Sequence, residues 1–145
     1  MTNKRTNILI GAALVYKERG KKRFYWLVTD KEGKWEIPKV TVRRGESSPR
    51  AVIRMTGEQA GMNSRILEEV GRQSGVVTVN SKTMVQKTLY YLMVFKSAGE
   101  VLGFAKHQWL NYKDALKILP SKKEKEAVRT AEEMLRKWEK EKKKR

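Results

Sequence analysis

The sequence from residue 38 to residue 61 is PKVTVRRGESSPRAVIRMTGEQAG. Its second half carries the start and stop signals of a helix. The serines at positions 47 and 48 can cap free backbone amides, and Pro49 fits the first helical turn. Gly61 can adopt the left-handed conformation that ends a helix. These signals predict a helix from Pro49 to Ala60, preceded by a basic loop.

Two strands are predicted before this stretch. Residues 8–16 and 22–29 are rich in apolar, β-branched and aromatic side chains, and a polar turn with Gly20 separates them. The pattern predicts an antiparallel hairpin. A second turn leads to a short strand at residues 35–37. Pro38 ends it because proline cannot donate a hydrogen bond to a sheet, and we expect a loop to follow.

A longer hairpin is predicted after Gly61. Its strands cover residues 66–79 and 83–96, and both are rich in valine, leucine and aromatic residues. We then expect a short strand at residues 108–110 and a short helix at residues 112–119, which Pro120 closes.

The last predicted element is a helix that docks on the core. Ser121 and Glu124 form a capping box at its start, and an apolar stripe continues to Trp138. Residues 139–145 contain no apolar side chain, so we expect this segment to be free or bound to something acidic. The sequence therefore predicts one domain over residues 1–138 and a basic tail over residues 139–145.

The composition excludes several kinds of site. The 145 residues include no cysteine and one histidine. The lack of cysteine rules out disulfides, a zinc ribbon, an iron–sulfur cluster and thiol catalysis, and we expect no Ser-His-Asp triad because no serine or aspartate motif accompanies His107. A bound metal ion would therefore need carboxylates as its ligands. No apolar segment approaches the ~20 residues of a membrane span, and the N-terminus lacks a secretory signal. We therefore expect a cytoplasmic protein.

The charge of the chain points to a polyanionic partner. There are 33 lysine and arginine residues against 16 aspartate and glutamate residues, a net charge of +17. Such a surface attracts nucleic-acid phosphates and gains from counterion release. Nucleic acid is therefore the leading partner, and the alternative is a solvated surface that only maintains solubility.

The stretch quoted first resembles the sequence box of the Nudix hydrolases. That box is Gly, five residues, Glu, seven residues, Arg-Glu-apolar-any-Glu-Glu-any-Gly, and Glu46, Arg54, Glu58 and Gly61 stand at its spacings. The order of the surrounding elements is most similar to the diadenosine tetraphosphate hydrolase branch. The resemblance implies an α/β/α sandwich with a mixed β-sheet. It also implies that Glu46 and Arg54 brace the loop against the helix, while Gly61 ends the helix.

The box departs from the family at the positions that bind metal. Val40 replaces the first glycine, Met55 replaces one glutamate, and Gln59 replaces another. Residues 55, 58 and 59 are spaced to share one helix face, which here offers a single carboxylate. Magnesium requires oxygen ligands, and a thioether does not supply them. We therefore expect no catalytic residue and no bound metal.

RNA binding by a catalytically degenerate Nudix domain is the main hypothesis. The protein would be a small ribosomal or ribosome-associated component, with ribosomal RNA and neighbouring ribosomal proteins as partners and with no membrane or disulfide partner. The predicted RNA-binding residues are Lys4, Arg5, Lys21, Lys22, Arg23, Lys39, Arg43, Arg44, Lys140, Lys142, Lys143, Lys144 and Arg145.

Two alternatives remain open. One is a nucleoside polyphosphate hydrolase that uses Mg or Mn, with Glu58 and Glu46 as catalytic groups and with Glu58 and Gln59 as metal ligands. The other is a nucleotide sensor that binds its ligand without hydrolysing it.

Overall fold

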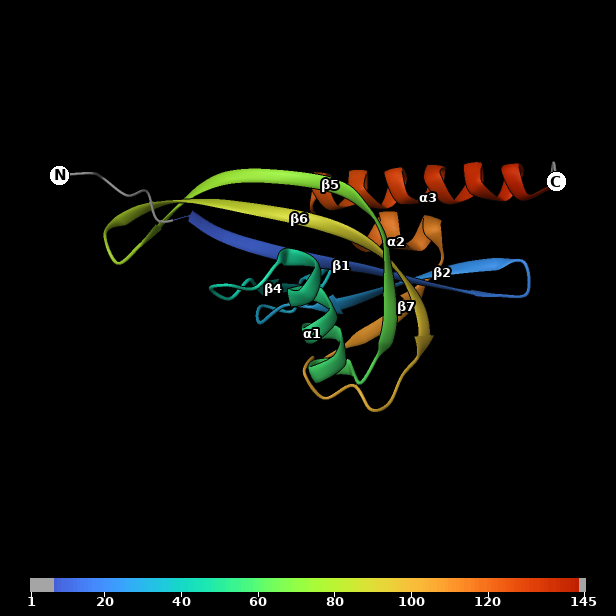
Figure 1. Ribbon diagram of the computed structural model, residues 1–145, viewed down its shortest axis with the longest axis horizontal. Coiled ribbons are helices and arrows are strands. Elements are labelled where there is room, and N and C mark those ends of the chain that lie inside the picture. The colour runs from blue at the N-terminus through green and yellow to red at the C-terminus, as the bar shows by residue number, and fades with distance from the viewer. Residues whose placement is uncertain (1–6, 144–145) are drawn as a thin grey trace.

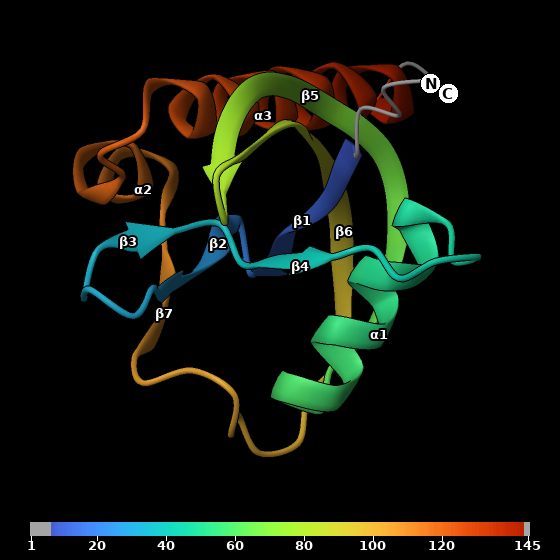
Figure 2. The same ribbon diagram turned by 90° about the vertical axis from the view of Figure 1, so that its left-hand side faces the viewer.

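The computed structural model describes residues 7–143. A mixed β-sheet lies between helices on both of its faces (Figure 1, Figure 2). The elements in chain order are β1 (Asn7–Arg19), β2 (Lys22–Thr29), β3 (Trp35–Glu36), β4 (Lys39–Thr41), α1 (Ser48–Ala60), β5 (Asn63–Val79), β6 (Lys82–Ser97), β7 (His107–Leu110), α2 (Tyr112–Ile118) and α3 (Lys122–Lys143).

The sheet is built around β1. The strand order is β3-β2-β1-β6-β5, while β4 pairs with β1 and β7 pairs with β2. Strand β1 runs parallel to β6, with Asn7 opposite Val85 and Tyr16 opposite Val94. All other pairs of strands are antiparallel. The predicted hairpins β1–β2 and β5–β6 are both confirmed.

Side chains of β1 alternate between two hydrophobic clusters. Ala12 and Leu14 pack with α2 and α3 on one face of the sheet. Ala13 and Val15 pack with α1 on the other face. A strand that is covered on both faces has a continuous apolar sequence, which explains the unbroken run of apolar residues in β1. The predicted α/β/α sandwich is confirmed.

Strand β4 corrects one expectation. We expected a loop directly after Pro38, but Lys39–Thr41 pairs with β1. The Ala13 amide donates to the Pro38 carbonyl oxygen at 2.9 Å, and the Val42 amide donates to the Leu9 carbonyl oxygen at 2.8 Å. Proline lacks a donor but keeps its acceptor, so Pro38 ends β3 without preventing the chain from pairing with β1.

Helix α3 is longer than its apolar stripe. We expected residues after Trp138 to form a free or bound tail, whereas the helix continues to Lys143. Glutamate and lysine are good helix formers. In addition, Glu139 forms an ion pair with Arg23 of β2, so the expectation of a free segment is wrong at this residue. Across residues 7–143, none of the helices has the length and hydropathy that a bilayer span requires.

Candidate functional site

Helix α1 begins and ends as its sequence predicts. The Arg50 amide donates to Ser47 Oγ at the N-cap, at 3.3 Å. Gly61 has a φ of +58° at the C-cap. The Gly61 and Met62 amides then donate to carbonyl oxygens of the last helical turn, both at 3.0 Å. These contacts fix the ends of the element that carries the box residues.

Glu46 and Arg54 join the loop after β4 to α1. Arg54 Nε donates to Glu46 Oε2 at 2.8 Å, and Arg54 Nη2 donates to Glu46 Oε1 at 3.0 Å. The Arg43 amide also donates to Glu46 Oε1, at 3.1 Å. The hydrogen bonds from Arg54 and then from Arg43 lower the pKa of Glu46 to about 2. The structure therefore brings this pair together in the bracing role that the resemblance implied.

The three box positions that we expected on one face of α1 differ in how deeply they are buried. Met55 is 0% exposed and lies in the hydrophobic cluster between α1 and the sheet. The Glu58 side chain is 60% exposed, with its carboxylate 3.9 Å from Arg54 Nη1. Gln59 is partly exposed, more than Met55 and less than Glu58. The three positions lie on one side of α1, where Met55 packs into the core and only Glu58 and Gln59 reach solvent.

The segment between β6 and β7 covers the end of α1. The amides of Leu102 and Gly103 both donate to the Gln59 carbonyl oxygen, at 3.0 and 2.9 Å. A Cβ atom added at Gly103 would lie 2.4 Å from Gln59 Cβ. Val101 and Phe104 pack against the cluster that contains Met55. Sequence reasoning missed this cover, and glycine at position 103 was its only local signal.

The side chains around α1 do not fit a magnesium or manganese site. Both ions prefer several oxygen ligands, with carboxylates among them. Here Met55 presents a buried thioether, and Val40 adds apolar atoms to the same cluster. Within residues 7–143, no three histidine, aspartate or glutamate side chains come together as a metal site would require. We therefore assign no metal-dependent step to this helix.

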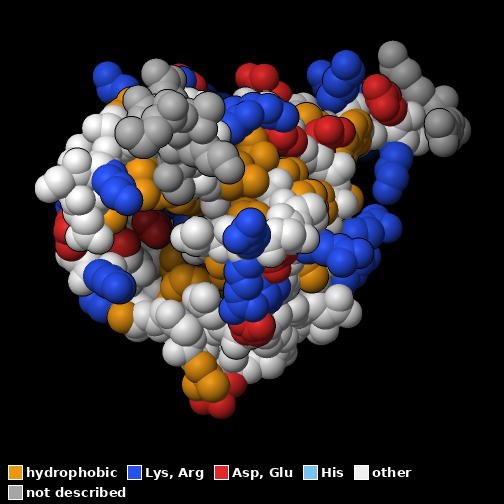
Figure 3. Space-filling view, turned by 60° about the vertical axis from the view of Figure 1, so that its left-hand side comes forward, with side chains coloured by type: hydrophobic (Ala, Val, Ile, Leu, Met, Phe, Trp, Pro, Cys, Tyr) orange, Lys and Arg blue, Asp and Glu red, His pale blue; other side chains and the backbone are white. Residues whose placement is uncertain are grey.

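A cleft of 360 Å³ lies between β3, the β5–β6 hairpin and the start of α3. It is lined in part by Lys34, Trp35, Lys39, Tyr90 and Glu124. Figure 3 shows this side of the molecule, where acidic and apolar side chains lie in a hollow with lysine or arginine at its edge. Sequence reasoning placed Lys39 in a basic loop, but it did not identify the cleft.

A buried carboxylate forms the floor of this cleft. Glu124 is 3% exposed, and its Oε1 accepts the Ile37 amide at 3.1 Å. Its Oε2 is buried and accepts no hydrogen bond among residues 7–143, although Lys39 Nζ forms an ion pair with it. Glu36 lies 3.7 Å from the same ammonium group. Burial raises the pKa of Glu36, and Lys39 opposes that rise.

The predicted RNA-binding residues lie at separate places. Lys21 and Lys22 are exposed at the turn of the β1–β2 hairpin, close to the end of α3, whereas Arg43 and Arg44 are exposed in the loop before α1 (Figure 1). Arg23 is held among carboxylates. Lys39 is held in the cleft. Lys140, Lys142 and Lys143 occupy the last turn of α3, and Lys4, Arg5, Lys144 and Arg145 lie outside the described residues.

Comparisons with known proteins agree with this architecture. The NUDIX domain family model matches residues 9–136. A C. elegans Ap4A hydrolase in a binary complex is 20% identical, with a TM-score of 0.72 over 88% of this chain and 97% of that chain. The NUDIX domain of Shewanella oneidensis NrtR complexed with ADP ribose is 16% identical, with a TM-score of 0.65 over 90% of this chain and 89% of that chain. No curated protein matches the chain.

Proposed function

This chain belongs to the NUDIX domain family, and we propose that it binds the phosphate chain of a nucleoside polyphosphate in the cleft of Lys34, Trp35 and Lys39. The observation that carries the proposal is the cleft itself. It places two cationic side chains beside an aromatic ring in a hollow of 360 Å³. Ammonium groups bind phosphate oxygens, and an aromatic face can stack on a base.

The structural relatives support this class of ligand. One relative is an Ap4A hydrolase, and another holds ADP ribose. Both compounds join an adenosine to a chain of phosphates. This chain has the same fold, so a ligand of that class is the first to test. The carboxylates of Asp30, Glu36 and Glu124 also line the cleft. Glu36 and Glu124 pair with Lys39, whereas Lys34 lies 3.6 Å from Glu32 but is 67% exposed, so it is the more accessible cation.

The proposed activity is binding without fast hydrolysis. Hydrolysis of a diphosphate linkage in this family would use Mg or Mn to neutralise phosphate charge and activate water. The buried Met55 and the neutral Gln59 offer a poor donor set for those ions. A sensor or carrier role, in which the ligand is held and released intact, suits these side chains better.

Hydrolysis is the second candidate, and one observation favours it. Glu46, Arg54, Glu58 and Gly61 keep the family spacing, and the Ap4A hydrolase likeness covers most of both chains. In that case Glu58 would be the principal metal-binding carboxylate. The prediction that RNA and ribosomal proteins are partners stays a prediction beside both candidates.

Calorimetric titration with Ap4A, ATP and ADP ribose tests the binding proposal. We expect Lys34→Ala to weaken binding about tenfold, the equivalent of about 1.4 kcal/mol. Lys31→Ala is the matched control, because it removes an exposed lysine from the same turn without touching the cleft. Failure of all three ligands to bind, or equal losses in both variants, would refute the proposal.

A turnover assay separates the two candidates. The three compounds are incubated with the protein and either Mg or Mn, and the products are quantified over time. Binding without turnover supports the sensor role. Sustained turnover that disappears in Glu58→Gln would instead establish the hydrolase.

A further inference from the structure

A second, larger cleft lies beside the turn of the β1–β2 hairpin. Its volume is 640 Å³, and it is bounded by the hairpin turn, the start of α2 and the last turns of α3. Figure 1 shows the hairpin turn and the end of α3 at the same end of the molecule. The lining includes Lys21, Lys22, Lys113, Phe24 and Tyr112. It shares no residue with the cleft of Trp35.

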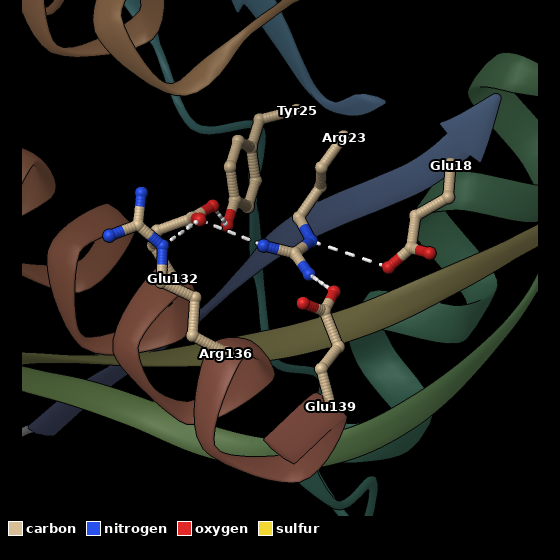
Figure 4. Close-up of polar contacts among 6 residues, drawn as sticks. All are labelled: Glu18, Arg23, Tyr25, Glu132, Arg136 and Glu139. Carbon is tan, nitrogen blue, oxygen red and sulfur yellow. Dashed lines mark hydrogen bonds and ion pairs between the residues drawn. The ribbon is translucent and has the colours of Figure 1, made fainter. Parts of the chain in front are cut away.

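The carboxylates in this cleft are already paired. Glu132 accepts hydrogen bonds from Arg23 Nη1 and the Tyr25 hydroxyl, both at 2.8 Å, and from Arg136 Nε at 2.9 Å. Arg23 in turn contacts Glu18 and Glu139 (Figure 4). The side chains of Arg23 and Glu132 are only 10% and 7% exposed. Glu132 is therefore neutralised inside the protein, whereas Glu18 and Glu139, which are 47% and 52% exposed, lie at the edge of the cleft.

The lysines at the rim have no such partners. Among the ion pairs of residues 7–143, none involves Lys21, Lys22 or Lys113. In addition, Arg19 stands directly opposite Lys22 in the hairpin register. Facing like charges destabilise a pair of strands. A bound anion at this turn would relieve that repulsion.

Aromatic side chains give the cleft a second property. Phe24 and Tyr112 line it, and both are partly exposed. The Arg136 guanidinium lies 5.7 Å from the centre of the Tyr112 ring. Cationic rims combined with aromatic and guanidinium surfaces bind single-stranded nucleic acid, because phosphates meet the cations while exposed bases stack on the flat groups.

We propose that this cleft binds single-stranded nucleic acid, with Lys21, Lys22 and Lys113 on the phosphates. Glu139 limits the affinity of the site, because its carboxylate is 52% exposed and adds a negative charge at the edge of the cleft. The cleft brings together Lys21 and Lys22 of the hairpin turn with Lys113 of α2, which lies far away in the sequence. The inference stands apart from the nucleotide proposal because the two clefts are separate.

Fluorescence anisotropy with labelled 12-mers of uridine and of deoxythymidine tests the proposal. The variant Lys21→Ala/Lys22→Ala removes two phosphate contacts. Each contact on a single strand contributes about 0.7 to the slope of log affinity against log salt. We expect the slope to flatten by about 1.4 and binding at 0.1 M salt to weaken about 25-fold. Lys122→Ala/Lys123→Ala, at the other end of α3, removes the same charge and should leave the slope unchanged.

A gain of affinity provides the sharper test. Glu139→Ala should strengthen binding a few-fold, because it removes a half-exposed carboxylate that repels phosphates at the edge of the cleft. Glu141→Ala removes the same charge, but Glu141 lines a different groove beside α3. This variant should therefore change the affinity much less. Equal gains in these two variants, equal losses in the two lysine variants, or no binding of either 12-mer would overturn the proposal. Similar affinity for the two 12-mers identifies general single-strand binding, whereas a preference for uridine identifies RNA.

Discussion

At the scale of single residues, Glu46 carries a pH dependence that can be measured. Its pKa falls from an ordinary 4.5 to about 2, chiefly because Arg54 donates to it. A carboxyl group with a lowered pKa stabilises the fold above its unfolded pKa and loses that contribution as the pH falls through the folded pKa. The stabilisation is therefore complete near pH 6 and disappears between about pH 4.5 and pH 2.

We expect Glu46→Gln to lower the melting temperature at pH 6, and the difference from the unaltered protein to shrink as the pH approaches 2. Thermal denaturation followed by circular dichroism at several pH values measures this. Glu58→Gln is the control, because that carboxylate is mostly exposed and lies 3.9 Å from Arg54. A difference for Glu46→Gln that stays constant down to pH 2 would contradict the assignment.

Gly11 shows how closely β1 approaches α1. A Cβ atom at this position would lie 2.7 Å from Val52 Cγ1 and 3.3 Å from the Ser48 carbonyl oxygen. We expect Gly11→Ala to cost about 1–3 kcal/mol in urea unfolding, the usual cost of overpacking. Gly75→Ala serves as the comparison because nothing lies within 4 Å of its added Cβ. Equal stability of the two variants would show that α1 can move away from the sheet.

At the scale of elements, Glu132 attaches α3 to the β1–β2 hairpin. Burial alone would raise its pKa, but hydrogen bonds from Tyr25 and Arg23 outweigh burial and lower it. We expect Glu132→Ala to lower the free energy of unfolding by about 3 kcal/mol, since Arg23 and the Tyr25 hydroxyl would lose a buried partner. Arg136→Ala should cost under about 1 kcal/mol, because that side chain is 63% exposed.

Chemical denaturation measures both variants, and the double change Arg23→Met with Glu132→Leu completes the comparison. It removes both buried charges, so it should be more stable than Glu132→Ala. If Glu132→Ala instead costs no more than Arg136→Ala, the network does not hold α3 in place.

Local signals predicted the elements well, but not the contacts between segments far apart in the sequence. The serine cap and Gly61 set the bounds of α1 because capping depends on a few neighbouring residues. Met55 follows Ala51 and Val52 at helical spacing, so hydrophobic periodicity predicts its burial. The segment that covers Gln59 could not be predicted, since it lies far away in the sequence. The contact of Arg23 with Glu139 spans 116 positions, and no local pattern encodes it. The two clefts were missed for the same reason.

At the scale of the whole molecule, charge repulsion opposes folding. The chain has 33 basic and 16 acidic residues, and a compact state brings the excess positive charges together. Salt shortens the range of this repulsion, from about 30 Å at 0.01 M to about 10 Å at 0.1 M. We expect the melting temperature to rise by a few degrees over that range, as measured by calorimetry.

A variant with fewer charges tests the cause of this rise. Replacing the exposed residues Lys122, Lys123, Lys142 and Lys143 with glutamine lowers the net charge by four, so its melting temperature should depend less on salt. A melting temperature that falls with salt would mean that attractive ion pairs outweigh the repulsion.

The parallel pairing of β1 with β6 affects how the chain folds during synthesis. Leu14 pairs with Leu92, which is 78 positions later. At about 5–20 residues per second, the ribosome takes roughly 4–16 s to add that length. Until then the central strand of the sheet has only β2 and the short strand β4 as early partners, and the edge that pairs with β6 stays open to water or to chaperones. Slow translation between β2 and β6 would lengthen this exposure, so the speed of synthesis in that region influences how much of the protein escapes aggregation.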